Sequence, residues 1–266
     1  MSQSLEDNSL WYHYKSKVWP EESGQTYSVH NIVRTLRSIH NQGELAYMSM
    51  PITSGKILYD ELSQHLYSEE LLNLVTSSAS SAEKYKEFPK FKDIIKTVMD
   101  KNYLLGVAFL EDLEKRINKP ILFPADLFPR GEKWSQDNFQ ALWLTLISEK
   151  CSELHLCKDW EYSNGAAEEF THVYQLRLGI PNGGFGAEDI SPFFNTKEGI
   201  EKSRARMRNI SVYDYQGNTV SLADGIKKID EVISWLKSGP FNLGKIEKTR
   251  ELLEWTFDMT EKGFYQ

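Results

Sequence analysis

The stretch "SELHLCKDWEYSNGAAEEFTHVYQLRLGIP", residues 152–181, sets out a strand, a loop and a helix in order. Within its first six residues, "ELHLC" (153–157) predicts a short buried strand. "DWEYSNGAAEE" (159–169) then brings small polar residues and an acidic pair, which is typical of a helix N-terminus. Gly179 and Pro181 close the helical pattern that follows. A strand that leads through a short loop into a helix is the building step of α/β proteins.

The same step occurs twice upstream. "ELAYMSMP" (44–51) is a short apolar run that ends at a proline, and "KPILFPADLFP" (119–129) predicts a second strand that stops at Pro124. Helical patterns stand between the strands, at 52–67, at 91–117 with a break expected near Gly106, and at 134–151. This alternation predicts a flavodoxin-like, doubly wound α/β fold, with a mainly parallel sheet and helices on both faces.

Further segments surround this core. We expect a helical N-terminal extension at 1–44, an α/β domain at 45–182 and a C-terminal extension at 183–266. A helical insertion at about 62–118 accounts for a first connection that exceeds the roughly 30 residues of a minimal βαβ unit. The C-terminal extension is expected to pack on the same domain, with a loop, a strand and turn, and amphipathic helices at 223–237 and 244–262.

Composition excludes several classes of function. The net charge is −7, with 31 basic and 38 acidic residues, so no nucleic-acid partner is expected. The short basic cluster at 202–208 is interpreted as a solvated helix face. No apolar run is long enough for a membrane span or a secretory signal, so no membrane partner is expected. Cys151 and Cys157, interpreted as buried thiols, indicate a reducing compartment and a cytoplasmic location.

Ligands of open α/β sheets bind beyond the carboxyl ends of the strands. Three predicted loops leave these ends, at 50–56, 124–134 and 159–169. Small residues in such loops let backbone amides approach an anion or a sugar at a helix N-terminus; here they are Ser54, Gly55, Ser163, Asn164 and Gly165. The alternative is that these are ordinary helix caps.

Glu169 is the candidate reactive group. It falls in the second helical turn and shares a face with Ala166 and Val173, whereas Glu168 points about 100° away. A carboxylate on such a face is a candidate nucleophile or base. The alternative is a surface glutamate that the helix dipole favours. Glu169 and His172 also form an E-x-x-H pair, but no second pair is evident, so no metal and no other cofactor is expected.

Taken together, the three loops resemble those of the nucleoside 2-deoxyribosyltransferase-like superfamily, in particular a branch of small bacterial and phage proteins. "AYMSMPITSG" (46–55) is similar to the family's "YISGPMTG", and "FPADLF" (123–128) is similar to its "NPAEL" stretch. "DWEYSNGAAEE" (159–169) is similar to "GWENSRGARLE" in order and spacing. The resemblance covers about a third of the chain.

The resemblance implies cleavage of an N-glycosidic bond in a nucleoside or nucleoside monophosphate. A glutamate four residues after the loop glycine attacks the sugar in the family, and counting from Gly165 this position is Glu169. Water or a second base then takes the sugar, which would make the protein a hydrolase or a transferase. In this hypothesis, Asp126 or Asn164 would orient the sugar in place of an aspartate that the family uses. Ser54, Gly55 and Ser163 would take up a phosphate or hydroxyl, and Trp160 or Tyr162 would stack on the base unless packed in the core.

One departure keeps other functions open. The family often has a sugar-holding aspartate on the helix before the third strand, and here this place falls near Trp143 or Leu144, with Asp137 about two turns earlier. A second hypothesis is therefore a catalytically inactive nucleotide-binding or regulatory protein with the same crevice. A third is an interaction module whose C-terminal amphipathic helices bind a partner or a second copy of the chain.

Overall fold

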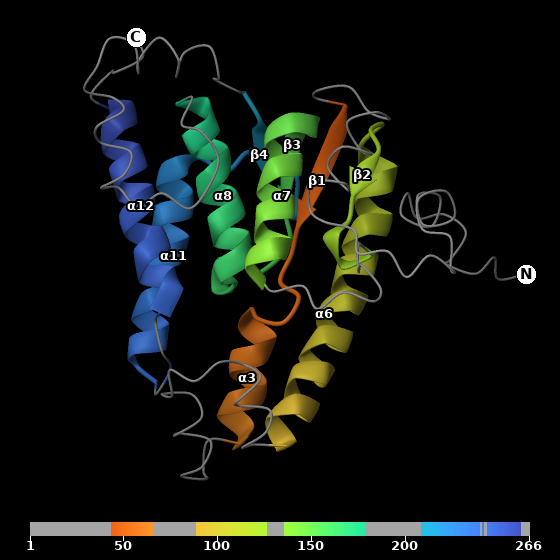
Figure 1. The fold of residues 1–266 in the computed structure, drawn as a ribbon, viewed down its shortest axis with the longest axis vertical. Coiled ribbons are helices and arrows are strands. Elements are labelled where there is room, and N and C mark those ends of the chain that lie inside the picture. Colours follow the sequence, from red (N-terminus) through yellow and green to blue (C-terminus); the bar gives the residue numbers. More distant parts are fainter. Residues whose placement is uncertain are drawn as a thin grey trace, which may run out of the picture.

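The computed structural model describes residues 44–65, 89–126, 136–178, 209–239, 241 and 244–261. Four parallel strands form one sheet in the order β2-β1-β3-β4 (Figure 1). Their bounds are β1 (Leu45–Ser49), β2 (Ile121–Leu122), β3 (Cys151–Leu156) and β4 (Ser211–Tyr213). The predicted α/β fold with a parallel sheet is confirmed.

Prolines keep β2 short. Pro120 and Pro124 stand on either side of its two strand residues, and proline has no amide hydrogen to give to a ladder. The carbonyl of Pro120 still accepts a hydrogen bond of 3.0 Å from the amide of Ala46. After β2 the chain turns through the short helix η2 (Pro124–Asp126). The predicted second strand is therefore real, but only its centre pairs with β1.

Helices cover the two faces of the sheet. Alternate residues of β1 face opposite sides, as the pleat of a strand requires. Ala46 and Met48 pack with α6 (Pro89–Arg116), whereas Leu45 and Tyr47 pack in the larger core with α7 (Gln136–Lys150) and α8 (Asn164–Arg177). The sheet is thus enclosed between α6 on one side and α7 with α8 on the other.

The expectation that the helix breaks near Gly106 is wrong. Helix α6 runs without interruption from Pro89 to Arg116. A β-carbon built on Gly106 would lie only 2.6 Å from the sulfur of Met50 and 3.0 Å from the ring of Phe123. Glycine at this place therefore serves the close approach of α6 to the ends of β1 and β2, and not a bend in the helix.

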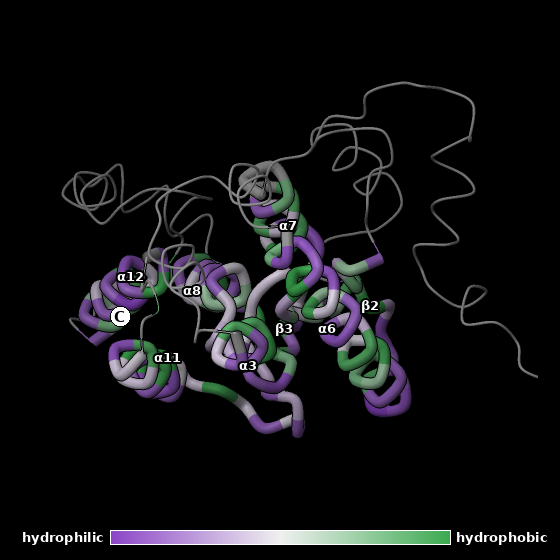
Figure 2. Tube along the Cα trace, turned by 90° about the horizontal axis from the view of Figure 1, so that it is seen from below, coloured by the Kyte–Doolittle hydropathy of each residue, from purple (hydrophilic) through white to green (hydrophobic). Residues whose placement is uncertain are grey.

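The described residues of the C-terminal part include one strand and two helices, which pack on the same core. Strand β4 pairs with β3, and α11 (Leu222–Lys237) and α12 (Gly244–Glu261) lie beside α8 in both Figure 1 and Figure 2. Ser221 and Asp224 close the start of α11 with a reciprocal capping box. Of the apolar residues predicted on one face of α11, Ile229, Ile233 and Leu236 are buried and Ile226 packs at the edge of the core.

Several expectations concern single residues or segments. Cys151 and Cys157 are both buried, free thiols, as predicted. His155 is buried and stacks on Tyr213 with ring centroids 5.1 Å apart, as expected of a core histidine. The predicted N-terminal helix, the basic cluster at 202–208 and the glycine-rich loop after Leu178 lie outside the described residues. Among the described helices, none combines the length and apolar character needed to cross a membrane.

Candidate functional site

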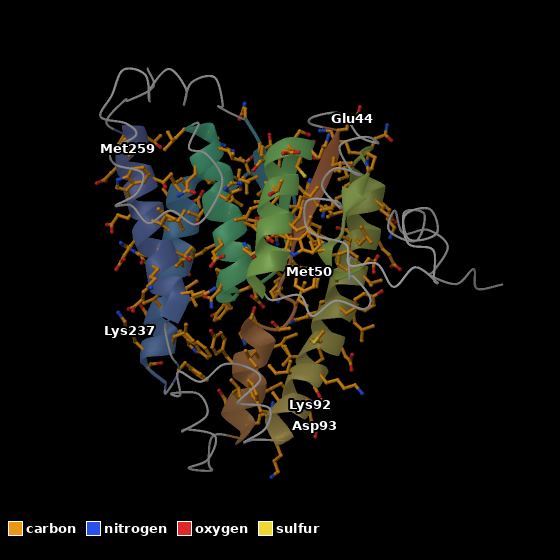
Figure 3. All side chains as sticks on the ribbon, viewed as in Figure 1. Glu44, Met50, Lys92, Asp93, Lys237 and Met259 are labelled. Carbon is orange, nitrogen blue, oxygen red and sulfur yellow. The ribbon has the colours of Figure 1, made fainter. Side chains whose placement is uncertain are left out.

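The strand order fixes where a ligand site is expected. From β1 the chain moves outward to β2, then crosses back over β1 to β3, so the direction of winding reverses between β1 and β3. Open α/β sheets bind their ligands beyond the carboxyl ends of the strands at such a reversal. Figure 3 marks this end of β1 with Met50, next to α3 (Lys56–His65). The loops 50–55 and 157–163 both start here.

These two loops touch each other. The hydroxyl oxygens of Ser54 and Ser163 lie 3.0 Å apart. Asn102 of α6 fixes the loop 50–55: its Nδ2 donates hydrogen bonds to the carbonyls of Ile52 and Ser54 at 3.0 and 2.9 Å. Gly55 has φ +87°, in the left-handed region that favours glycine. The structure thus brings together two of the three predicted ligand loops.

Ser163 also caps α8. Its hydroxyl accepts a hydrogen bond from the amide of Ala166 at 3.4 Å, so the ordinary-cap interpretation holds for this residue. Asn164 and Gly165 form the first turn and are half-buried. The first amides of a helix have no partner within the helix. The N-terminus of α8 therefore lies directly beside the Ser54 contact.

Glu169 is enclosed, so the alternative of a surface glutamate is wrong. Its side chain is only 5% exposed, whereas Glu168 is half-buried. The hydroxyl of Tyr47 donates to Oε1 of Glu169 at 2.6 Å, and the hydroxyl of Ser49 donates to Oε2 at 2.6 Å. Both donors lie on β1, two residues apart, and face α8. The carboxylate is therefore fixed at the point where β1 ends.

Burial sets the protonation of this carboxyl group. Enclosure in the core raises the pKa of Glu169 to about 7, against the lowering effect of the hydrogen bonds from Ser49 and Tyr47 and with a small rise from Glu168. The pKa of Tyr47 is raised by burial and by the neighbouring Glu169, so Tyr47 keeps its proton and donates a hydrogen bond to the carboxylate. Near neutral pH, Glu169 consequently exists in both its charged and its neutral form.

The remaining predicted site residues make other contacts. Asp126 follows β2, where the hydroxyl of Tyr103 donates to its Oδ1 at 3.4 Å. Trp160 is 2% exposed and packs on Phe170 with ring centroids 4.7 Å apart, so its ring faces the core and not a ligand. Tyr162 is half-buried and contacts other aromatic rings. Of the two aromatic candidates for base stacking, only Tyr162 retains an exposed part.

Sequence reasoning missed the partners of Glu169. Tyr47 and Ser49 stand at alternate positions of an otherwise apolar strand, and this pattern was the available signal. Gln140 of α7 was also missed: its Oε1 lies 3.5 Å from where a β-carbon of Gly165 would stand. Of Trp143 and Leu144, where the resemblance led us to expect a sugar-holding acid, Trp143 is buried in the core and Leu144 is half-buried.

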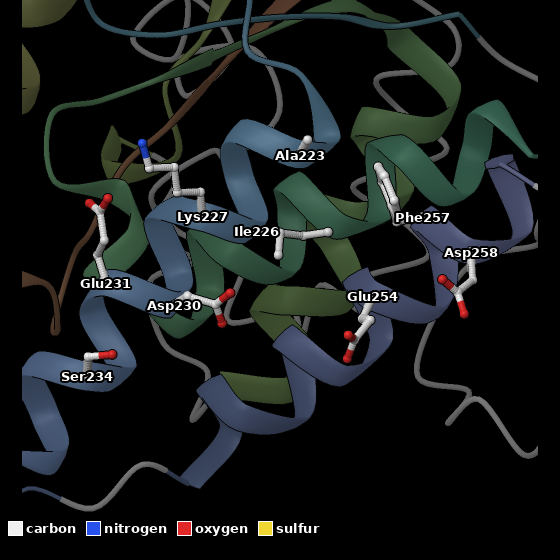
Figure 4. Close-up of a pocket in the computed structure, with 9 residues that line it drawn as sticks. All are labelled: Ala223, Ile226, Lys227, Asp230, Glu231, Ser234, Glu254, Phe257 and Asp258. Carbon is white, nitrogen blue, oxygen red and sulfur yellow. The ribbon is translucent and has the colours of Figure 1, made fainter.

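The region around Glu169 coincides neither with a possible metal site among the described residues nor with the pocket between α11 and α12. Within the described residues, no group of three or more His, Cys, Asp or Glu side chains is placed to hold a metal ion. A pocket of about 770 Å³ lies between α11 and α12 (Figure 4). It has an apolar part at Ala223, Ile226 and Phe257 and a charged rim, and its lining includes no residue of β1, β3 or their loops. The Glu169 region remains the candidate site on grounds of geometry and chemistry.

Comparisons with protein-family models, with curated proteins and with solved structures gave no match to this chain.

Proposed function

We propose that this protein cleaves or transfers the N-glycosidic bond of a nucleoside or nucleoside monophosphate, with Glu169 as the nucleophile. The observation that carries the proposal is the enclosed carboxylate at the β1/β3 reversal, held by hydroxyl donors from Tyr47 and Ser49. The order and spacing of the three loops, which resemble those of the nucleoside 2-deoxyribosyltransferase-like superfamily, specify the substrate class.

The reaction needs two displacements. An oxygen of Glu169 attacks the anomeric carbon of the sugar, the carbon–nitrogen bond breaks, and the electron pair leaves with the base. The resulting glycosyl ester is then opened by water, which yields the free sugar, or by a second base, which yields a new nucleoside. A negative carboxylate suits the first step because the transition state carries oxocarbenium-like positive charge.

Tyr47 and Ser49 orient the nucleophile without consuming it. Each carboxylate oxygen has two lone pairs, so a hydroxyl donor on each still leaves lone pairs for attack. These donors also favour the charged form of Glu169, which the attack requires, while burial opposes it. The predicted consequence is a reaction that accelerates as the pH rises through about 7.

The contacting loops supply candidate groups for the rest of the substrate. The amides of Asn164 and Gly165 at the N-terminus of α8, with the hydroxyls of Ser54 and Ser163, suit a phosphate or a sugar hydroxyl. Gly55 lets the first loop turn beside them. Asp126 belongs to the neighbouring β2 end, where it would contact a more distant part of the ligand.

The test is release of a free base from a panel of nucleosides and nucleoside 5′-monophosphates. Wild-type protein is expected to release base, and Glu169→Gln, which keeps the size of the side chain, should reduce the rate by at least about 10³-fold. Glu168→Gln is the matched control and should retain the wild-type rate. Equal rates in the two variants would contradict the role of Glu169, and no release from any substrate would contradict the activity.

A catalytically inactive nucleotide-binding or regulatory protein is the second candidate. It is favoured by the enclosure of Glu169, which is 5% exposed, and by the lack of a carboxylate at Trp143 and Leu144, where the resemblance leads us to expect the sugar-holding acid. Such a protein would gain thermal stability from a nucleotide, because a ligand that binds only the folded state raises the unfolding temperature. Stabilisation without any released base would select this candidate over the enzyme.

A further inference from the structure

One enclosed side-chain nitrogen next to the candidate site has no hydrogen-bond partner. Nε2 of Gln140, on α7, is enclosed and makes no hydrogen bond. Nearly all buried polar atoms in proteins are paired, because an unpaired donor loses its bonds to water without replacement. A donor retained in this state therefore calls for an explanation, and a ligand that supplies the missing acceptor is one.

The position of Gln140 relates it to Glu169. Its Oε1 lies 3.5 Å from the place of a β-carbon on Gly165, so the amide rests against the bare backbone of the first turn of α8. Gly165 and Glu169 are four residues apart and share one face of the helix, with their backbones about 6 Å apart along its axis. Gln140 thus contacts the turn of α8 that precedes the turn carrying Glu169.

The side-chain amide of Gln140 can turn its N–H group toward a ligand beside Gly165 without a movement of the backbone. Gln140 is half-buried as a whole, although its Nε2 is enclosed. The terminal torsion of a glutamine side chain is soft and has a broad, two-fold preference. A turn about this torsion exchanges the positions of nitrogen and oxygen beside Gly165, where no side chain intervenes.

We infer that the Gln140 side-chain amide binds a sugar hydroxyl of the substrate, beside the carbon that Glu169 attacks; the inference rests on the proposed function. A primary amide offers a donor and an acceptor, and a hydroxyl group offers the same two, so one side chain can satisfy both needs of a hydroxyl. A phosphate at neutral pH supplies mainly acceptors and matches less well. Its contact with the turn of α8 before Glu169 suits a group on the sugar ring that carries the reacting carbon. Gln140 is then a positioning and specificity residue.

The experiment compares Gln140→Leu with a matched control, Gln175→Leu. Gln175 also lies on a helix of the core and also has a buried Nε2 without a partner, but it is six residues beyond Glu169 along α8. Gln140→Leu should raise KM about five- to tenfold with kcat within about twofold, as expected for loss of one hydrogen bond made throughout the reaction. Gln175→Leu should change neither constant.

Substrates that lack single hydroxyls identify the contact. For the deoxy substrate that lacks the contacted hydroxyl, wild-type and Gln140→Leu should have the same KM. Thermal unfolding without ligand should occur at an equal or higher temperature in Gln140→Leu, because the change removes an unpaired buried donor. A purely structural role would instead lower this temperature. An unchanged KM, or an equal rise for every deoxy substrate, would overturn the inference.

The two proposals fail in different ways. If the wild-type protein releases no base, the proposed activity is contradicted, and the same variants are then compared by the Kd for nucleosides in calorimetry. A rise in Kd for Gln140→Leu alone would still support the sugar contact, and equal Kd values, or no binding, would overturn it. If the wild-type protein is active and Gln140→Leu matches it, only the inference on Gln140 falls.

Discussion

The hydroxyl of Ser49 donates a hydrogen bond of 2.6 Å to Oε2 of Glu169, and this contact joins residues that are 120 positions apart in the chain. It ties the last residue of β1 to the second turn of α8. Because Tyr47 makes the companion bond from the same strand, the carboxylate cannot turn without breaking one of them. The proposed nucleophile is therefore positioned by the sheet and not by a loop.

The stability of the protein should depend on the charge of Glu169. Its pKa is raised to about 7 in the folded protein from an ordinary value of 4.5, so its stabilising contribution is complete below pH 4.5 and is lost as the pH rises through about 7. The loss amounts to about 3 kcal/mol. Urea unfolding of wild-type and Glu169→Gln between pH 4.5 and 8 should therefore diverge over this interval. Parallel curves would contradict the raised pKa.

The pH profile of activity should move when a donor is removed. The hydrogen bonds from Ser49 and Tyr47 lower the pKa of Glu169 relative to burial alone. Ser49→Ala should therefore shift the rising limb of kcat/KM to higher pH, because more base is needed to ionise the nucleophile. Ser63→Ala, which removes a hydroxyl on the exposed surface of α3, is the control and should leave the profile in place. A shift to lower pH would exclude the donor role.

Two glycines of the contacting loops should respond differently to alanine. Gly55 has φ +87°, and a β-carbon there would lie 2.6 Å from Cβ of Pro51, so Gly55→Ala should lower the free energy of unfolding by more than about 1 kcal/mol. Gly165 lies in a helix and a β-carbon would meet only Oε1 of Gln140 at 3.5 Å. Gly165→Ala should thus leave stability nearly unchanged. Denaturant midpoints measured side by side check the contrast.

Substitutions on the two sides of the contact between α11 and α8 should have non-additive effects on the free energy of unfolding. A β-carbon on Gly225 would lie 2.2 Å from ring carbons of Phe170, the residue after Glu169. Gly225→Ala should destabilise by about 1–3 kcal/mol through overpacking, although alanine is the better helix former. Phe170→Leu should relieve part of this loss, which gives a coupling energy of about 0.5–3 kcal/mol in a double-mutant cycle. Additive losses would show that the two residues do not meet.

The sequence predicted the positions of strands and helices better than the contacts between their side chains. Apolar runs located β1 and β3 because buried parallel strands are apolar on both faces, and the count from Gly165 separated Glu169 from Glu168. The partners of Glu169 could not be predicted, since which strand residue faces which helix turn depends on register and packing. The break predicted at Gly106 was wrong because glycine has a low helix propensity, which suggested an interruption. The glycine instead allows Met50 to approach the helix, and this contact could not be predicted from the sequence.

The candidate ligand-binding residues show the same difference between what composition predicts and what packing decides. Ser54 and Ser163 were predicted from loop composition and do meet. Trp160 was predicted from its place in the motif, and its enclosure depends on Phe170 and on helices that follow much later. Composition can mark a loop as a candidate for ligand binding, but which of its side chains turns inward is decided by tertiary packing.

The pairing of β3 with β4 has a consequence for how the chain is made. β4 begins at Ser211, whereas β1, β2 and β3 are complete by Leu156. During synthesis from the N-terminus, the outer edge of β3 therefore stays without its strand partner while more than fifty further residues are added. An uncovered strand edge is a template for pairing with other chains. Nascent chains halted before Ser211 should consequently be prone to associate, and release of the full chain should end that exposure.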